Sequence, residues 1–274
     1  MSGVNATEST IRAADGTELW GRRWEPATET RGEILLVHGL GEHLGRYQDV
    51  AAGLTARGFA LQGVDLRGHG RSAGRRGHVE RWSDYHADLD AAARGLRRPH
   101  LVLAHSMGGL VALDWLRDRP DQVAAVVLSS PLLGVAAAAP RWKVLLGKVL
   151  ARIAPRLPLS NELDPEGVCS DPKVVERYLA DPLVFRSITP RWFVEMERAL
   201  ERVHTAAPAL RHPLYLNLAG DERLVSNPQA LALADAWGGA VTRVVWDRLR
   251  HETLNEQAGP TVLRAIIDWL EERP

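Results

Sequence analysis

Ser106 has the sequence surroundings of a nucleophilic serine. The run LVLAHSMGGLVALDWL begins as an apolar stretch typical of a buried strand, turns at Ser106, and continues as a helix-forming stretch. A strand–turn–helix of this kind exposes the hydroxyl at the carboxyl end of a sheet, and its usual pattern is G-x-S-x-G. Ala104 replaces the first glycine, and Gly108 supplies the second. Small residues around a serine also occur where a helix packs closely on a strand. The interpretation of Ser106 as a nucleophile therefore depends on the predicted strand before it and the predicted helix after it.

A serine hydroxyl is a weak nucleophile until a neighbouring base removes its proton, and the base is usually histidine. Of the ten histidines, His251 fits best, because it follows the last predicted strand (residues 242–246) after a short polar loop. That loop can return to the carboxyl edge of the sheet. His204 and His212 lie in or beside an insertion, and His105 is too close to Ser106 in sequence to face its hydroxyl correctly.

The acid that orients the histidine must follow the preceding strand, in the segment LYLNLAGDERLVS. The chain order nucleophile, acid, histidine requires this position. Two adjacent carboxylates are available there, Asp221 and Glu222. We prefer Glu222, because it stands two residues before the apolar pair that re-enters the fold, and Asp221 remains the alternative.

Two backbone amides are candidates for holding the oxyanion formed when the hydroxyl adds to a carbonyl. The strand before His38 ends at Gly39, which lets the amide of Leu40 turn toward the serine, and Met107 directly follows Ser106. Losing one such donor typically costs about 3 to 4 kcal/mol of transition-state stabilisation. The nearby glycine-rich run DLRGHGRS lacks the spacing of a phosphate-binding or dinucleotide-binding loop, so we interpret it, with His69, as structural.

The elements that position these residues follow an α/β pattern. Short apolar runs rich in valine, leucine and isoleucine alternate with longer amphipathic stretches, as in a parallel sheet wrapped by helices. Six such runs and an N-terminal hairpin predict about eight strands, at residues 9–13, 18–24, 34–37, 60–64, 101–104, 125–128, 214–218 and 242–246. A helical stripe at residues 260–272 is predicted to pack on the sheet.

The alternation of apolar strands and amphipathic stretches stops between residue 130 and about residue 208. Predicted helices separated by prolines, such as 141–153 and 190–203, occupy this region instead. We predict a core formed by residues 1–131 and 208–274, with a helical cap inserted at residues 132–207. The segment 141–153 is both basic and amphipathic. Two interpretations stay open: a helix that rests on a membrane surface while its apolar face lines an acyl tunnel, or a helix packed on the core with a solvated outer face.

The amino-acid composition limits the binding partners, the compartment and the cofactors that we expect for this protein. Lysine plus arginine equals aspartate plus glutamate, at 34 each, so no net field favours nucleic acid. The one cysteine, Cys169, excludes an internal disulfide and fits a reducing compartment. The first ten residues lack the pattern of a secretory signal, and no apolar run is long enough to span a membrane, so we expect a cytoplasmic protein. No histidine–carboxylate cluster has ligand spacing, so neither a metal nor an organic cofactor is expected.

With these residues in place, the chain resembles the monoglyceride lipase and lysophospholipase branch of the α/β hydrolases. The blocks HGLGEHLGRY, DLRGHGRSAGRRGHV, AHSMGG, LSSPLL, DPLVFRSITPRW and HETLNE occur in that family's order over nearly the full length. The resemblance implies an eight-stranded sheet, a cap after the sixth strand, and hydrolysis of acyl esters. It also implies Ser106 as nucleophile, His251 as base, and Leu40 and Met107 as oxyanion donors. The chain departs from the family at Ala104 and at Glu222, where aspartate is usual.

Three other functions share this fold and remain open. An aminopeptidase would need cap carboxylates to hold an ammonium group, and Glu162, Glu166, Glu195 and Glu197 are candidates. An acyltransferase would use the same three residues with an alcohol in place of water. A binding protein would keep the pocket without turnover. The leucine-rich cap favours a small-molecule ester with a medium or long acyl chain, and the sequence leaves the oligomeric state undetermined.

Overall fold

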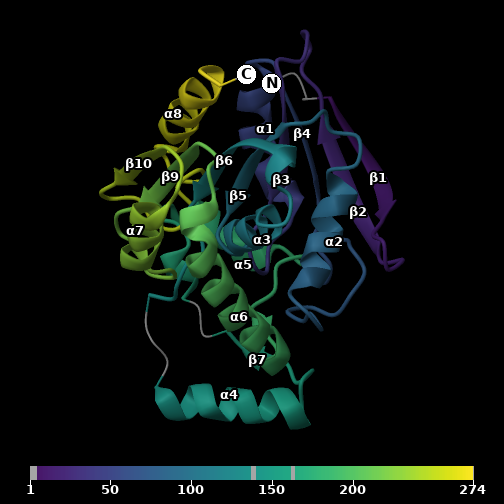
Figure 1. The fold of residues 1–274 in the computed structure, drawn as a ribbon, viewed down its shortest axis with the longest axis vertical. Helices are drawn as coiled ribbons and strands as arrows, with labels where there is room; N and C mark the ends of the chain where they lie inside the picture. The colour runs from purple at the N-terminus through teal and green to yellow at the C-terminus, as the bar shows by residue number, and fades with distance from the viewer. Residues whose placement is uncertain (1–4, 137–139, 162–163, 274) are drawn as a thin grey trace.

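The computed structural model describes residues 5–136, 140–161 and 164–273, and its centre is a twisted eight-stranded sheet (Figure 1). The strands lie in the order β1-β2-β4-β3-β5-β6-β9-β10. Their bounds are β1 Ala6–Arg12, β2 Glu18–Trp24, β3 Gly32–Val37, β4 Phe59–Val64, β5 His100–His105, β6 Val123–Ser129, β9 Leu214–Ala219 and β10 Val241–Trp246. β2 runs antiparallel to β1 and β4, and all other neighbours are parallel. The predicted α/β-hydrolase sheet is therefore confirmed.

Helices cover both faces of the sheet, because the central strands are buried on both sides. Alternate residues of β3 illustrate this: Ile34 and Leu36 belong to one apolar cluster, and Leu35 and Val37 belong to the other. The first cluster includes side chains of α1 (Gln48–Thr55) and α8 (Gly259–Glu271), and the second includes side chains of α2 (Ser83–Ala92), α3 (Met107–Leu116) and α7 (Asn227–Ala236). α8 follows the predicted stripe to within one residue at each end.

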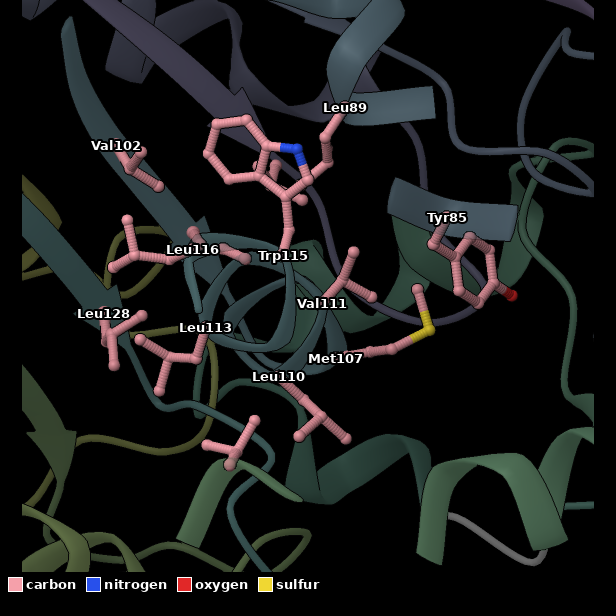
Figure 2. Packing of buried hydrophobic residues seen from close by; sticks show 14 of the residues in the cluster. Tyr85, Leu89, Val102, Met107, Leu110, Val111, Leu113, Trp115, Leu116 and Leu128 are labelled. Carbon is pink, nitrogen blue, oxygen red and sulfur yellow. The ribbon is translucent and has the colours of Figure 1, made fainter. Parts of the chain in front are cut away.

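α3 is the most deeply buried helix of the core. Every residue from Met107 to Leu116 is buried, and Figure 2 shows the large apolar side chains of this helix among Val102 of β5, Leu128 of β6 and Leu89 of α2. An apolar helix fixed on all sides in this way is stabilised mainly by tertiary packing rather than by intrinsic propensity. The helix therefore holds its N-terminus, and the preceding residue Ser106, at a fixed place above the sheet.

Between β6 and β9 the chain leaves the sheet to form the elements that we group as a cap, as proposed for residues 132–207. They are α4 (Arg141–Ile153), β7 (Leu159–Ser160), α5 (Pro172–Ala180), β8 (Ser187–Ile188) and α6 (Pro190–Ala206). α4 matches the predicted helix at both ends, whereas the short antiparallel pair β7–β8 was not predicted. Two-residue strands carry too few residues to show an alternating pattern.

α6 links the cap to the core through a buried carboxylate. Asp114 of α3 is fully buried and accepts hydrogen bonds from the Arg202 guanidinium of α6 at 2.6 and 3.1 Å and from Arg117 at 2.6 Å. Burial alone would raise the pKa of Asp114, but its hydrogen bonds with His86, Arg202 and Arg117 lower it well below its ordinary value. Because α6 also lines the pocket described below, this contact fixes one wall of the pocket relative to α3.

Candidate active site

Ser106 occupies the sharp turn between β5 and α3. Its φ of 51° and ψ of −121° lie in a region that non-glycine residues rarely adopt, at a cost of about 1 to 3 kcal/mol. Neighbouring backbone groups hold it there: its N–H donates to the carbonyl of Ser129 at 3.0 Å, and its carbonyl accepts from Gly109 at 2.9 Å and Leu132 at 2.8 Å. The turn therefore belongs to the packed core and is not a flexible loop.

Gly108 is the position where this turn requires the smallest residue. A Cβ atom there would lie 2.4 Å from the carbonyl oxygen of His38 and 2.5 Å from that of Val37. The start of α3 thus packs directly on the end of β3. Gly39, at that end of β3, is similarly constrained, because an added Cβ would lie 3.1 Å from the Cβ of Ser106.

The structure brings His251 and Glu222 to Ser106. His251 Nε2 lies 2.9 Å from Ser106 Oγ, and His251 Nδ1 lies 2.9 Å from Glu222 Oε2. The other carboxylate oxygen of Glu222 accepts the backbone N–H groups of Leu224 at 2.8 Å and Val225 at 3.2 Å. The side chains of His251 and Glu222 are only 7% and 2% exposed, so water screens this ion pair weakly.

Asp221 lies elsewhere. Its side chain is 41% exposed and pairs with Arg223 at 2.8 Å and, more weakly, with Arg250 at 3.4 Å. The Arg223 hydrogen bond lowers the pKa of Asp221, and none of these contacts involves His251. Of the two adjacent carboxylates, Glu222 is the one that faces the histidine, and the amides of Leu224 and Val225 hold its carboxylate in that orientation.

Protonation states in this group follow from burial and neighbouring charge. Burial alone would lower the pKa of His251, but the charge and hydrogen bond of Glu222, followed by the charges of Glu252 and Glu42, raise it above its ordinary value. Burial alone would raise the pKa of Glu222, but His251 and the two backbone amides lower it. Glu222 is therefore ionised at neutral pH, and it favours a proton on Nδ1 of His251, which leaves Nε2 to accept the serine proton.

Leu40 and Met107 flank the serine as the candidate oxyanion donors. Met107 is the first residue of α3, so its N–H is one of the amides that an α-helix leaves without an intrahelical partner. Leu40 follows Gly39, and both line the pocket that contains Ser106. We propose that the amides of Leu40 and Met107 hold the oxyanion.

His38 and His69 support the loops around this site. The backbone N–H of Leu66 donates to His38 Nε2 at 2.9 Å, so the Nδ1 proton of His38 donates to the Gly39 carbonyl at 2.8 Å. Burial lowers the pKa of both histidines, that of His69 to about 3, so both are neutral. The Nδ1 atom of His69 lies 3.0 Å from the Arg67 carbonyl oxygen, and its ring lies near the rings of His38, Tyr85 and Phe185, contacts that fit the structural interpretation of His69.

An apolar pocket of about 200 Å³ opens beside Ser106. Its walls come from the core loops and from the cap, and include Leu132, Val135, Val168, Ile188, Trp192, Phe193, Met196, Leu224 and Val225. Polar groups also reach it, among them Glu42, Asp164, Arg186 and Glu252. A serine hydroxyl at one side of an apolar pocket is suited to an acyl group.

One part of the expectation about the cap is wrong. We expected the helix at 141–153, now α4, either to rest on a membrane surface while its apolar face lines an acyl tunnel, or to pack on the core with a solvated outer face, and the pocket walls do not agree with the tunnel. Among the described residues, the cap contributes pocket walls from the segment before α4, from the segment between β7 and α5, and from α5, β8, α6 and the turn before β8, but none from α4. α4 packs against α6, with Gly147 facing Phe193 and Ala151 buried. Its large apolar side chains face outward instead.

Sequence analysis missed two groups of residues around the site. One pocket wall is formed by Trp192, Phe193 and Met196 of α6. The helical spacing of these apolar residues was visible in the sequence, but we used it only to predict a helix and not to predict a pocket wall. Glu42 and Arg46, four residues apart in the run EHLGR, form an ion pair beside Ser106 and His251. Their separation of four residues was the available signal, although Glu42 precedes the short 3₁₀ helix Leu44–Tyr47 that contains Arg46.

Known proteins resemble this chain over nearly its full length. A family model described as serine aminopeptidase, S33, matches residues 28–258. A monoacylglycerol lipase of Mycolicibacterium smegmatis is 32% identical over 98% of this chain and 99% of its own length. The crystal structure of a Paleococcus ferrophilus monoacylglycerol lipase superposes with a TM-score of 0.84 at 33% identity, covering 93% of this chain and 99% of that one.

An uncharacterised abhydrolase domain-containing protein of Dictyostelium discoideum is 29% identical over 98% of this chain, which spans 29% of that protein's length. The matches to lipases agree with the resemblance of the motif blocks and with the observed sheet. The chain belongs to the serine aminopeptidase S33 family of α/β hydrolases, in the branch that includes the monoglyceride lipases.

Proposed function

We propose that this protein is a serine hydrolase that cleaves carboxylic esters of the monoacylglycerol or lysophospholipid type through an acyl-enzyme on Ser106. The observation that carries the proposal is His251, which lies 2.9 Å from both Ser106 Oγ and a buried Glu222 carboxylate oxygen. Membership of a branch that includes monoacylglycerol lipases, as reported for the relatives above, supports the ester class.

In the first half of the reaction, His251 Nε2 takes the proton of Ser106 as Oγ attacks the ester carbonyl. The amides of Leu40 and Met107 hold the resulting oxyanion, and Glu222 stabilises the imidazolium without taking its proton. When the tetrahedral intermediate collapses, its C–O bond to the alcohol breaks and the imidazolium gives its proton to the leaving oxygen. The alcohol departs and the acyl group stays on Ser106.

In the second half, water takes the place of the alcohol. His251 removes a proton from the water as it attacks the acyl-enzyme, and the same amides hold the second oxyanion. Collapse returns the proton to Ser106 and releases the carboxylic acid. No metal or organic group is needed for either half.

The pocket supports acyl esters as the substrate class. Its walls are mostly apolar, so each methylene buried there contributes roughly 0.8 kcal/mol, and two extra carbons raise kcat/KM by up to about fifteenfold. Turnover of p-nitrophenyl esters from acetyl to decanoyl measures this. We expect kcat/KM to rise until the pocket is full, and a flat or falling series contradicts an acyl pocket.

A fluorophosphonate probe tests the nucleophile directly. Such a probe phosphonylates a serine that a neighbouring base activates, so wild-type protein is expected to gain one adduct on the peptide that contains Ser106. Ser106→Ala is the negative control, and Ser130→Ala is the matched control, because Ser130 is also a buried serine with a positive φ. An unlabelled wild-type protein, or labelling that survives in Ser106→Ala, refutes the proposal.

The aminopeptidase alternative receives less support. Of the four glutamates considered for holding an ammonium group, Glu162 lies outside the described residues. Glu195 is buried and accepts from the Trp82 amide and from Arg198, and Glu197 pairs with Lys148. Neither these two nor Glu166 lines the pocket. Turnover of aminoacyl anilides at a rate above that of acyl esters would reverse this preference.

We further propose that α4 contacts a lipid surface. Its residues Trp142, Leu145, Leu146, Val149 and Ile153 are between 45% and 74% exposed. Figure 1 shows α4 at the end of the molecule opposite α8 and the termini, beyond the rest of the cap. Lys148 and Arg152 lie on the same helix, so an apolar face is combined with basic charge, a combination that favours anionic interfaces. Among the described residues, no helix is long and apolar enough to cross a membrane.

Leu145→Glu tests this contact. Moving an exposed leucine from lipid to water loses about 1.5 to 3 kcal/mol, so binding to vesicles should weaken roughly tenfold or more, while turnover of a soluble short-chain ester stays unchanged. Leu179→Glu, at an exposed leucine of α5, is the matched control. Equal vesicle binding by both variants contradicts the proposal.

For location, we propose the cytoplasm, which the single free and buried Cys169 supports.

A further inference from the structure

A buried ion cluster joins the loop that carries Leu40 to the loop that carries His251. The Arg46 guanidinium bridges two carboxylates: Nη1 lies 2.9 Å from Glu42 Oε2, and Nη1 and Nη2 donate to the two oxygens of Glu252 at 2.5 and 2.7 Å. Glu42 and Arg46 follow β3, whereas Glu252 follows β10, 206 residues further along the chain. The cluster therefore connects two segments that the sheet alone does not hold together.

Each carboxylate of this cluster is tied to a candidate catalytic segment. Glu42 Oε1 accepts the backbone N–H of Gly39 at 2.6 Å and the Tyr47 hydroxyl at 2.7 Å, so it fixes the turn directly before Leu40. Glu252 is the residue after His251, and its own N–H donates to the Val168 carbonyl at 2.8 Å. Displacing either carboxylate would move the backbone beside the reacting groups.

Burial makes the cluster rigid. The side chains of Glu42, Arg46 and Glu252 are 5%, 11% and 7% exposed, and the guanidinium lies 5.1 Å from the ring centroid of Tyr178. Exposed ion pairs exchange readily with water and contribute little. A buried pair must keep its geometry, because separation of the partners would leave an uncompensated charge in a poorly solvated place.

We propose that Arg46 is a positioning residue, which sets the distance between the Leu40 amide and the His251 imidazole by bridging Glu42 and Glu252. The proposal rests on the proposed function, since it takes Leu40 as an oxyanion donor and His251 as the base. Arg46 acts through its two partners and does not contact the Ser106 hydroxyl.

The cluster also shapes the charge around His251. With two carboxylates and one guanidinium, it places a net negative charge beside the imidazole and favours the imidazolium that forms during acyl transfer. In agreement with this, Glu252 and Glu42 both raise the pKa of His251. The charged and titratable groups around His251 come from five parts of the chain. They are His105 at the end of β5, Glu222 after β9, Glu252 beside His251, Glu42 and Arg46 after β3, and Asp164 and Arg186 from the cap.

Two conservative variants separate positioning from a merely structural role. Arg46→Lys keeps the charge but cannot donate in parallel to Glu252 while bonding Glu42, so we expect kcat for a soluble p-nitrophenyl ester to fall roughly ten- to a hundredfold with KM nearly unchanged. Glu252→Gln keeps the shape but removes a negative charge near His251. We expect it to lower kcat and to shift the acid limb of the kcat/KM profile down by about half a pH unit to one unit.

The matched control is Glu271→Gln, since Glu271 also bridges two arginines, Arg31 and Arg57, but near the amino end of β3, away from Ser106. Melting temperature is measured for every variant. The proposal is overturned if Glu252→Gln lowers only the melting temperature and keeps the wild-type kcat and acid limb. If Glu252→Gln fails to fold, Arg46→Lys decides, and a wild-type kcat overturns the proposal. An inactive, unlabelled wild-type protein would instead refute the proposed function.

Discussion

Replacing Glu222 by glutamine removes the negative charge that lies against Nδ1 of His251 and leaves the size of the side chain nearly unchanged. His251 Nδ1 and Glu222 Oε2 are 2.9 Å apart, and the two side chains are only 7% and 2% exposed. With charge centres about 4 Å apart and an effective dielectric constant of about 20, the imidazolium loses about 4 kcal/mol of stabilisation. Since each 1.36 kcal/mol is tenfold in rate, kcat should fall roughly a thousandfold.

The neighbouring carboxylate provides the control for this prediction. Asp221→Asn removes a charge one residue away that is exposed and paired with Arg223, so kcat should change by less than about twofold. Steady-state turnover of a soluble p-nitrophenyl ester at pH 7.5 to 8 measures both variants, and circular dichroism checks that they fold. The reasoning fails if Glu222→Gln keeps kcat within tenfold of the wild type, or if Asp221→Asn loses as much activity.

Three further predictions follow from the same contacts. The pKa of His251 is raised, and its imidazole must be neutral to act as the base. The kcat/KM value should therefore fall as the pH drops through a value above 6.5, the ordinary pKa of histidine. An acid limb below pH 6 contradicts the assigned charges. Ser106→Gly relieves a strained φ of 51°, so urea unfolding should show about 1 kcal/mol of added stability in an inactive protein, and a less stable variant argues against strain. Asp114→Asn leaves the Arg202 and Arg117 guanidinium groups without their buried anion, so it should destabilise by about 3 kcal/mol or more, and a wild-type unfolding midpoint contradicts an anchoring role for α6.

The sheet, and the expectation that Ser106, His251 and Glu222 lie together, were accessible from sequence because both depend on local patterns. Each central strand is a short apolar run that ends in a polar or glycine turn, and the predicted strands at 18–24 and 242–246 differ from β2 and β10 by at most one residue. The first strand was placed later than β1, because its start is fixed by pairing Ala6 with Trp24, which a local pattern does not contain. Glu222 was preferred over Asp221 from its distance to the apolar pair Leu224–Val225, whose amides hold it in the structure.

The surroundings of the site were not accessible in the same way. The stripe of α4 indicates an amphipathic helix, but amphipathic residues cannot specify what covers their apolar face, and here α6 covers only part of it. The contact between Arg46 and Glu252 joins residues 206 positions apart, and nothing in either local sequence identifies the other. Such contacts depend on how the loops at the carboxyl edge of the sheet converge, which follows from the complete fold.

The most direct test of the account is to trap the covalent intermediate during turnover. Protein that is mixed with p-nitrophenyl butyrate, quenched in acid within milliseconds and digested should carry a butyryl group on the peptide that contains Ser106. The same peptide should stay unmodified in Ser106→Ala, and the adduct should form far more slowly in His251→Ala. Ester turnover without any acyl adduct on Ser106, or an adduct that forms at the wild-type rate without His251, would contradict the central claim.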